Sequence, residues 1–477
     1  MTLRDLMGDG APDLEVVSLA YSSERVAPGA LFFCVPGSMA DGHEFAPDAV
    51  ERGAVALVCE RPLGLGVPEV LVKDVRAAMG PVAAPFYGDP TAELRVVGIT
   101  GTNGKTTTAF LTRALLDASG IQTGLLGTVK SIVGGREEPV ERTTPEAIDL
   151  QATFRRMLDA GDRACAMEVS SHALHLKRSS GIRFACRVFT NLTQDHLDFH
   201  PSMEDYFVAK RRLFDGPGPS VVNVDDSYGR RLAGEVADVT TCAVEAGADW
   251  RARDVRFDRA GSSFACDTPY GPIEVAMPLP GLFNVYNALT AMAAAAALGA
   301  PVEALPAALA GAARVPGRFE PVDEGQDFAV LVDYAHTPDS LENVLRAARE
   351  ISEGRLHVVF GAGGDRDRLK RPQMGRVAAA LADRAIVTSD NPRSEDPAAI
   401  VDEILTGVGE DMERELDRRT AIERAIASAH AGDVVVIAGK GHEQGQEFEG
   451  GRKEPFDDRD VARDALRAGL AGVEART

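Results

Sequence analysis

Short runs of β-branched and other apolar residues alternate along most of the chain with longer segments rich in alanine and leucine. This alternation is typical of parallel α/β sheets, in which a strand is followed by a helix. Several of the runs are apolar at almost every position, as expected for strands that are covered on both faces. The pattern predicts core strands at residues 95–100, 164–170, 187–193, 220–225, 328–334, 356–360, 385–389 and 433–438.

Two breaks in this pattern indicate boundaries between domains. Residues 86–90 (Phe-Tyr-Gly-Asp-Pro) separate an N-terminal segment from the strand at 95–100, and residues 315–318 (Val-Pro-Gly-Arg) precede the strand that opens the last third. Such clusters of glycine and proline mark turns. A chain of 477 residues is long enough for about three domains of ordinary size. We therefore predict an α/β protein with domains at residues 1–90, 91–316 and 317–477.

Composition and charge narrow the class of protein. The 72 acidic residues outnumber the 51 basic ones, and the formal charge of −21 opposes nonspecific binding to nucleic acid. The six cysteines show no metal-type spacing, and the polar start does not resemble a signal peptide. The most apolar stretch, residues 288–300, is too short to cross a bilayer and predicts a buried helix. We expect a soluble, cytoplasmic protein that binds no nucleic acid and does not insert into membranes.

The strand at 95–100 leads directly into Gly-Thr-Asn-Gly-Lys-Thr-Thr at residues 101–107, followed by an apolar helical pattern. A glycine turn that opens a helix with Gly-Lys-Thr is typical of a phosphate-binding loop, because its N–H groups converge on phosphate oxygens. Lys105 would neutralise the β- and γ-phosphates, and the Thr106 hydroxyl would bind Mg²⁺. The strict pattern requires a glycine where the chain has Ile99. An ordinary glycine turn before a helix is the alternative.

A second cluster of polar side chains follows two later strands. Glu168 lies in an apolar run, where a carboxylate is costly unless it is paired or bound to a metal. Residues 172–200 contain four of the nine histidines, namely His172, His175, His196 and His200. The cluster is compatible with Mg²⁺ beside a nucleotide, with a zinc site, or with solvated histidines and a structural salt bridge. The phosphate-binding loop upstream favours magnesium.

Three polar segments each follow a predicted strand in the last third of the chain, at residues 361–371, 390–393 and 439–443. Because the carboxyl ends of parallel strands meet at one edge of a sheet, we expect all three segments at one ligand-binding crevice. The first segment lacks the third glycine of a dinucleotide fingerprint, which argues against an NAD site. Solvated turns are the alternative, since Asn-Pro commonly forms turns.

Taken together, these segments resemble the Mur ligase family over nearly the whole chain. Residues 98–107 match that family's own variant of the phosphate-binding loop, which accounts for the missing glycine. The other matches occur in order along the chain, at residues 168–172, 191–198, 206–210, 283–287, 317–320 and 333–336. The resemblance implies three domains: a smaller N-terminal α/β domain that binds UDP-sugar, a central P-loop ATPase-type parallel sheet, and a C-terminal Rossmann-like domain that receives the amino acid.

Within the family, the chain is most similar to the ligases that add the third residue of the peptidoglycan stem peptide. The resemblance implies an ATP- and Mg²⁺-dependent enzyme that joins meso-2,6-diaminopimelate to UDP-MurNAc-L-Ala-D-Glu through an acyl phosphate. These small molecules are its implied partners, and a monomer is expected. Residues 390–393 match the diaminopimelate-adding type, and Arg393 could grip the second carboxylate of that amino acid. L-Lysine, which lacks this carboxylate, is the alternative substrate.

The resemblance also implies roles for single residues. Catalysis would involve Lys105, Lys210 and His196. ATP would contact Gly101, Thr102, Asn103, Gly104, Lys105, Thr106, Thr107, Asn284, Asn287, Arg318 and Asp333. Metal ligands would be Thr106, Glu168, His196 and, as a carbamate, Lys210. The UDP-sugar peptide would contact Ser23, Ser38, Met39, Ala40, Thr143, Thr144, Ser170 and Arg178. The amino-acid pocket would comprise Arg366, Asp390, Asn391, Pro392, Arg393, Gly439 and Glu443. The chain differs from the family pattern at residues 22–24, Arg142 and Leu176.

Two other functions are weighed against this one. A folylpolyglutamate synthase is also an ATP-dependent amide ligase, but it lacks a separate UDP-binding domain and the segment at 390–393. A nucleotide-regulated binding module would hydrolyse ATP without ligation, so its ATP turnover would not depend on any nucleotide-sugar peptide.

Overall fold

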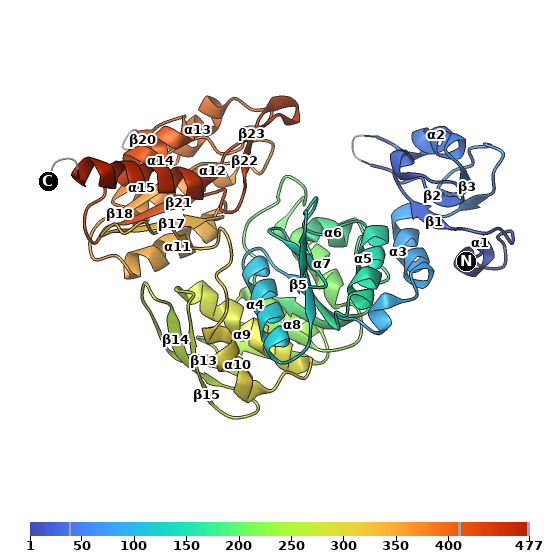
Figure 1. Ribbon diagram of the computed structural model, residues 1–477, viewed down its shortest axis with the longest axis horizontal. Coiled ribbons are helices and arrows are strands. Elements are labelled where there is room, and N and C mark those ends of the chain that lie inside the picture. Colours follow the sequence, from blue (N-terminus) through green and yellow to red (C-terminus); the bar gives the residue numbers. More distant parts are fainter. Residues whose placement is uncertain (38–39, 409–411, 475–477) are drawn as a thin grey trace. The chain divides into compact units, whose positions relative to one another are not determined.

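The computed structural model describes residues 1–37, 40–408 and 412–474 (Figure 1). The chain forms two compact units. The first comprises Met1–Thr100, Leu116–Val188 and Ala209–Pro219, and the second comprises Gly101–Leu115, Phe189–Val208 and Ser220–Thr477. Each unit contains hydrophobic cores of its own.

The first unit begins with a four-stranded parallel sheet in the order β1-β2-β3-β4. Helix α2 (Ala46–Glu51) packs on one face, and α1 (Leu3–Met7) and α3 (Val75–Phe86) pack on the other. The four residues of β2 are all buried because both faces of the strand are covered. The strands are β1 (Ser18–Ala20), β2 (Ala30–Phe33), β3 (Ala54–Cys59) and β4 (Glu69–Leu71).

The remaining strands of the first unit follow the order β10-β5-β9-β6-β7-β8. Strand β9 pairs in parallel with both β5 and β6, and β6 to β8 form an antiparallel meander. The strands are β5 (Arg95–Thr100), β6 (Thr123–Leu126), β7 (Ser131–Val133), β8 (Arg136–Glu138), β9 (Ala164–Glu168) and β10 (Phe184–Phe189). The helices of this region are α5 (Ala147–Asp159) and α6 (Ser171–His175).

The second unit contains a five-strand run in the order β15-β14-β13-β12-β11, parallel at one end and antiparallel at the other. The strands are β11 (Ser220–Asn223), β12 (Val239–Ala243), β13 (Trp250–Phe257), β14 (Ser262–Asp267) and β15 (Ile273–Met277). The helices are α8 (Ser227–Glu235), α9 (Leu282–Ala297) and α10 (Leu305–Ala310). Residues 287–295 of α9 are all buried, which confirms the buried helix predicted from its alanine-rich sequence.

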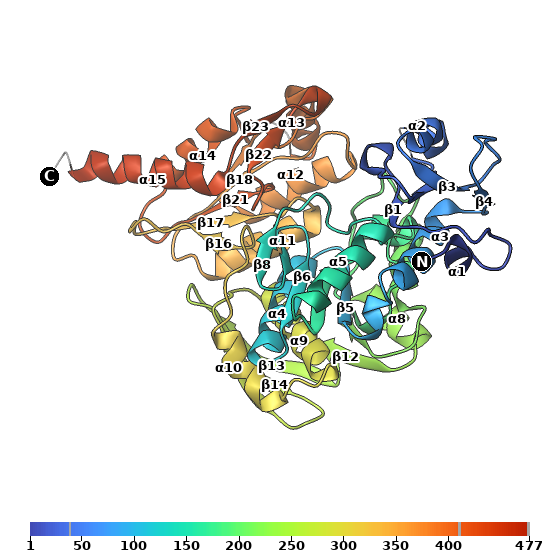
Figure 2. The ribbon, with the colours of Figure 1, turned by 45° about the vertical axis from the view of Figure 1, so that its right-hand side comes forward.

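The last third of the chain forms a six-stranded sheet between two layers of helices (Figures 1 and 2). The strand order is β16-β17-β21-β18-β19-β20, and the four central strands are parallel. One face packs on α11 (Pro338–Glu350), α12 (Lys370–Leu381) and α13 (Pro397–Leu405), and the other on α14 (Arg418–Ala427) and α15 (Asp458–Glu474). The strands are β16 (Glu320–Pro321), β17 (Ala329–Asp333), β18 (Leu356–Phe360), β19 (Arg384–Val387), β20 (Glu413–Arg414) and β21 (Val434–Ala438). A hairpin of β22 (Gly445–Glu447) and β23 (Lys453–Pro455) follows.

The predicted strand bounds are correct for β5 and β18. Strands β9, β10, β11 and β19 end two to four residues earlier than predicted, and β17 and β21 differ by one residue at one or both ends. Strand β9 ends at Glu168 rather than at 170, because Ser170 caps α6 by accepting from the Ala173 N–H at 3.2 Å. Strand β10 ends at Phe189 rather than at 193, because Asn191 O bonds the Thr102 N–H instead of continuing the sheet.

A buried ion pair ties α14 to α15 in the C-terminal sheet. The Arg418 Nε and Nη2 atoms donate to Asp458 at 2.8 and 2.7 Å, and both side chains are fully buried. Removing one partner of such a pair leaves an uncompensated charge and costs about 3–5 kcal/mol. We expect Asp458→Ala to lower the free energy of unfolding by about this amount in urea titrations followed by circular dichroism. Asp460→Ala, which breaks an exposed pair with Arg463 on the same helix, is the control and should change it little. Equal stability of the two variants would contradict the prediction.

Candidate active site

The predicted phosphate-binding loop lies between the end of β5 at Thr100 and the start of α4 (Lys105–Ala118). Gly101 and Gly104 have φ values of 151° and 84°, a region that favours glycine. A Cβ atom at Gly101 would lie 1.9 Å from Thr190 Oγ1, and one at Gly104 would lie 2.3 Å from Asn287 Oδ1. Conformation therefore favours glycine at both positions, and at Gly101 the Asn191 backbone, 3.1 Å from such a Cβ atom, also limits the space.

The loop is held by the segment that follows β10. The Asn103 N–H donates to Asn191 Oδ1 at 2.9 Å, and Thr190 Oγ1 donates to Asn103 O at 2.6 Å. Thr102 Oγ1 accepts from the Thr193 N–H at 3.0 Å. The side chain of Asn103 donates to Asp339 Oδ2 at 2.7 Å. These bonds fix the backbone that would surround a phosphate.

Two cationic side chains at the loop, Lys105 and Arg318, have hydrogen-bond partners within the protein. Lys105 Nζ donates to Gly101 O at 2.9 Å and to Thr102 O at 2.7 Å. Arg318 Nη2 donates to Thr106 Oγ1 at 3.2 Å. Lysine, arginine and the buried Thr106 hydroxyl therefore lie together at the start of α4, an arrangement suited to a polyphosphate.

The other residues predicted to contact ATP form two groups. Asn287 donates to Asn284 Oδ1 at 3.2 Å on α9, and both side chains are buried. Arg318 lies over the Tyr334 ring at 4.5 Å. Burial raises the pKa of Asp333, whose carboxylate accepts the Phe319 and Ala335 N–H groups at 2.6 and 2.7 Å.

His196 belongs to a charged cluster that sequence reasoning did not find. Its Nε2 atom lies 3.4 Å from Asp195 Oδ2, and Asp195 also lies 3.5 Å from Lys370 Nζ and 3.7 Å from His336 Nε2. Burial opposes the ionisation of Asp195, but Lys370, His336 and His196 together hold its pKa well below its usual range. The Lys370 ammonium and both imidazoles thus surround one buried carboxylate.

Glu168 lies at the end of β9, almost completely buried. Its Oε1 atom accepts the Thr128 N–H at 2.8 Å, and its Oε2 atom accepts the Thr128 hydroxyl at 3.1 Å. Thr128 Oγ1 lies 3.1 Å from Thr143 Oγ1, and Thr144 Oγ1 donates to Glu168 O at 2.9 Å. Glu168 is thereby joined to the paired threonines predicted to contact the sugar peptide.

Arg178 belongs to a group of three arginines around the buried Glu146 carboxylate. Arg178 Nε, Arg142 Nη1 and Arg76 Nη1 lie 2.9, 3.1 and 3.0 Å from Glu146 oxygens. Arg178 Nη1 also donates to Thr144 O at 3.4 Å. Three guanidinium groups face one carboxylate, so this part of the first unit is locally positive within a strongly acidic chain.

The remaining predicted residues of the first unit differ in exposure. Ser23 is buried in a short 3-10 helix, and Ala40 is exposed, with its carbonyl accepting the Gly37 N–H at 2.9 Å. Ser38 and Met39 lie outside the described residues. Lys210, on α7 (Met203–Arg211), has a side chain that is only 1% exposed. A buried lysine is unusual and needs compensation for its charge.

The loops after β18, β19 and β21 meet at one edge of the C-terminal sheet, as predicted from the parallel strands. A Cβ atom at Gly361 would lie 3.2 Å from the Asp390 side chain, and one at Gly439 would lie 2.4 Å from Asp390 Oδ2. Although burial opposes ionisation, Lys440 and Arg418 hold the pKa of Asp390 below its usual value. Asp390 is thus the point where the three loops converge.

Asn391, Glu443 and the fully buried Lys440 form a hydrogen-bonded triad at this edge. Asn391 Nδ2 donates to Glu443 Oε2 at 2.8 Å, and Lys440 Nζ donates to both Asn391 Oδ1 and Glu443 Oε2 at 2.8 and 3.0 Å. Lys440 was not among the predicted residues, although the segment that contains it was. Arg366 is exposed and donates to Asp365 O at 2.8 Å.

Backbone strain marks parts of the site. Among the described residues, eight non-glycine residues have positive φ, and these include His196 (56°) and Arg393 (51°). Phe319 and Asp365, the neighbours of Arg318 and Arg366, are two more. Such conformations persist where the surrounding structure imposes them, and they are frequent at binding sites.

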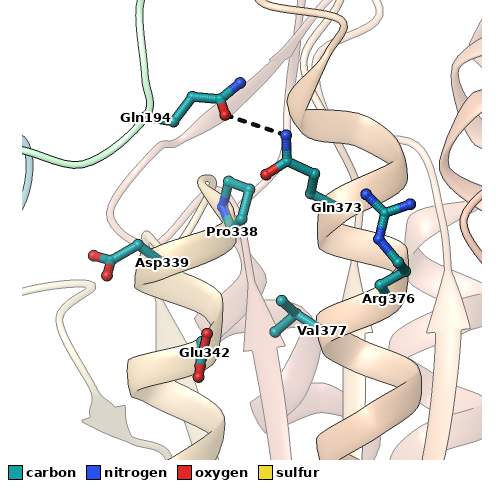
Figure 3. Close-up of a pocket in the computed structure, with 7 residues that line it drawn as sticks. All are labelled: Gln194, Pro338, Asp339, Glu342, Gln373, Arg376 and Val377. Carbon is teal, nitrogen blue, oxygen red and sulfur yellow. Dashed lines mark hydrogen bonds between the residues drawn. The ribbon is translucent and has the colours of Figure 1, made fainter. Parts of the chain in front are cut away.

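A pocket of about 370 Å³ opens beside Asp339, between the start of α11 and the middle of α12 (Figure 3). Gln373 on α12 donates to Gln194 Oε1 at 3.1 Å across one side of it, and Val377 lines the other side (Figure 3). Because Asp339 accepts from Asn103, this pocket adjoins the phosphate-binding loop.

Comparison with protein families assigns most of the chain. Residues 99–295 match the Mur ligase middle domain, residues 317–441 match the Mur ligase glutamate ligase domain, and residues 15–87 match the Mur ligase catalytic domain. The chain belongs to the Mur ligase family. Mur ligases are ATP-dependent enzymes that form amide bonds, which accounts for the phosphate-binding loop.

Relatives and solved structures agree with this assignment. The UDP-N-acetylmuramoyl-L-alanyl-D-glutamate–2,6-diaminopimelate ligase of Geobacillus kaustophilus is 49% identical over 473 residues, 96% of each chain. A solved structure with the same enzyme name is 32% identical, covers 98% of this Mur ligase and 99% of its own chain, and has a TM-score of 0.71. The MurF ligase of Thermotoga maritima, solved in complex with ADP, is 19% identical with a TM-score of 0.66 over 98% and 100% of the two chains, and shares the fold.

None of the described helices of this Mur ligase is long and apolar enough to cross a membrane. Within the same residues, no group of three or more His, Cys, Asp and Glu side chains could hold a metal ion.

Proposed function

We propose that this Mur ligase joins meso-2,6-diaminopimelate to the D-glutamate of UDP-MurNAc-L-Ala-D-Glu with consumption of ATP. The observation that carries this proposal is the identity of 45–49% to diaminopimelate ligases over 95–98% of the chain. Residues 15–87, which a folylpolyglutamate synthase would not need, are part of that match. The product would be a peptidoglycan precursor.

Two steps account for the products. The γ-carboxylate of D-glutamate attacks the γ-phosphorus of ATP, so that an acyl phosphate forms and ADP leaves. The amine of diaminopimelate then attacks the acyl carbon, and phosphate leaves with the bonding electron pair while the nitrogen loses a proton. Lys105 and Arg318, which lie at the start of α4, would neutralise the charge that spreads over the transferred phosphoryl group.

The donor groups proposed as metal ligands are of the chemical type that Mg²⁺ prefers. Thr106, Glu168 and a carbamate on Lys210 would supply oxygen ligands, which Mg²⁺ prefers. His196, which lies beside Asp195, would be a further metal ligand. When bound, Mg²⁺ neutralises phosphate charge.

The three family matches support the three domains proposed at residues 1–90, 91–316 and 317–477. The UDP-sugar peptide would bind the first of these and the paired threonines with Ser170 and Arg178, near the three arginines around Glu146. We further propose a cytoplasmic monomer that acts on small molecules without nucleic acid or membrane insertion. The charge of −21 supports the proposal on nucleic acid.

ADP release tests the proposed function. The enzyme is incubated with ATP, with or without UDP-MurNAc-L-Ala-D-Glu, and with meso-diaminopimelate, L-lysine or L-glutamate. We expect ADP release over many turnovers only when both the nucleotide-sugar dipeptide and diaminopimelate are present. ADP release at the same rate with and without the dipeptide would identify a nucleotide-regulated binding module instead. Activity with a folate and glutamate would identify a folylpolyglutamate synthase.

Arg393 is expected to select the amino acid. Its guanidinium would bind the distal carboxylate of diaminopimelate, which L-lysine lacks, and a lost buried charge pair costs about 2–5 kcal/mol. We therefore expect kcat/KM for meso-diaminopimelate to exceed that for L-lysine by at least about 100-fold, with most of the difference lost in Arg393→Ala. Equal use of the two amino acids by the wild-type enzyme would contradict this role.

A further inference from the structure

The orientation of Arg393 is imposed by the segment that carries β22. Arg393 Nε donates to Glu447 Oε2 at 3.0 Å, and the Arg393 backbone N–H donates to Glu447 O at the same distance. The Glu447 N–H in turn donates to Asn391 Oδ1 at 3.0 Å. Three hydrogen bonds thus join Glu447 to the segment at 390–393, two of them made by its backbone and one by its carboxylate.

These contacts determine which donors of Arg393 are left for a ligand. Nε is taken by Glu447, and Nη1 donates to Gly364 O at 2.7 Å. Within the part of the chain that the structure describes, Nη2 donates to no acceptor. One N–H of Nη1 and both N–H groups of Nη2 therefore remain for a ligand, and a carboxylate can accept from two guanidinium N–H groups at once.

We propose that Glu447 is a positioning residue that holds the guanidinium of Arg393 in the orientation that receives the distal carboxylate of the amino acid. This inference rests on the proposed function. An arginine side chain has several rotatable bonds, and fixing them before the ligand arrives lowers the entropic cost of binding. Glu447 is one-third exposed and stands opposite Lys453 in the β22–β23 hairpin. Its net contribution is therefore geometric rather than a strong electrostatic one.

The two substitutions of Glu447 separate geometry from charge. Glu447→Gln keeps an oxygen that accepts from Arg393 Nε, whereas Glu447→Ala removes the acceptor. We expect Glu447→Ala to raise KM for meso-diaminopimelate by about 5- to 10-fold with kcat within about 2-fold, as expected for one side chain that loses its preorganisation. Glu447→Gln should stay within about 2-fold of the wild type in both constants. KM for ATP and for UDP-MurNAc-L-Ala-D-Glu should not change in either variant.

A double-mutant cycle with Arg393→Ala tests whether Glu447 acts through Arg393. If it does, Glu447→Ala has no further effect on diaminopimelate use once Arg393 is alanine. Glu449→Ala, at an exposed glutamate two residues along the chain, is the matched control. The proposal is overturned if Glu447→Ala leaves KM unchanged, if Glu447→Gln is as impaired as alanine, or if the two effects add in the double variant.

Ligation by the wild-type enzyme distinguishes a failure of this inference from a failure of the proposed function. Failure of the wild type to ligate diaminopimelate would overturn both. Ligation that depends on Arg393 but not on Glu447 would overturn only the positioning role.

Discussion

Replacement of Lys105 by alanine is expected to lower ADP formation by at least about 100-fold, because one preorganised cation at a transferred phosphoryl group is worth that much. In the structure, the Lys105 ammonium bridges the carbonyls of Gly101 and Thr102, at the start of α4. A bound phosphate would compete for this ammonium. The measurement is the steady-state rate with saturating ATP, dipeptide and diaminopimelate.

The controls for Lys105 distinguish chemistry from folding. Lys105 is only partly buried, so its loss should leave the urea unfolding curve close to that of the wild type. Lys73→Ala, at an exposed lysine before α3, should keep full activity. A Lys105→Ala enzyme that retains more than a tenth of wild-type activity would contradict the assignment of the phosphate-binding loop.

Lys210→Ala is expected to be inactive in a buffer free of carboxylates, and acetate or formate should restore part of the activity. The Lys210 side chain is almost fully buried, where an ammonium is costly. Addition of CO₂ to the neutral amine forms an N–C bond with loss of a proton, and the resulting carbamate can bind a metal as a carboxylate does. Small carboxylates would replace that group in the space left by alanine.

A direct observation of the carbamate completes the Lys210 test. In enzyme equilibrated with ¹³C-bicarbonate, a carbamate carbon signal should be present in the wild type and absent from Lys210→Ala. Arg211, at the next position of α7, makes an exposed ion pair with Asp215, and Arg211→Ala serves as the control. An active Lys210→Ala enzyme without added carboxylate would refute the role.

Hydrophobic patterning predicted the buried parallel strands well and their polar ends poorly. Strands β5 and β18 have the bounds of the predicted apolar runs, and nearly all of their residues are buried. At the ends of β9 and β10, Ser170 and Asn191 make hydrogen bonds to a helix and a loop instead, and a propensity pattern does not include these partners. The N-terminal sheet was expected only as part of an α/β domain, since β1 and β4 are just three residues long.

The candidate site could be predicted where its residues form a contiguous motif. The segments at 101–107 and 390–393 are of this kind. Thr128, which holds Glu168, was not found. Lys370 lies in the predicted segment at 361–371, but its contact with Asp195 was not predicted. Each of the two residues lies far along the chain from its partner. Glu447 is a polar residue on a short strand, and only the tertiary contact with Arg393 distinguishes it.

The convergence of three loops on one edge of the C-terminal sheet has a consequence for how amino-acid preference could be inherited. The strands β18 and β21 consist of buried residues, and the proposed selecting residues lie beyond the ends of β18, β19 and β21. A graft of residues 390–396 alone would separate Arg393 from Glu447, whereas a joint graft with residues 439–448 would carry both. Divergence of specificity among enzymes built on this sheet would therefore require linked change in two segments that are distant in the gene.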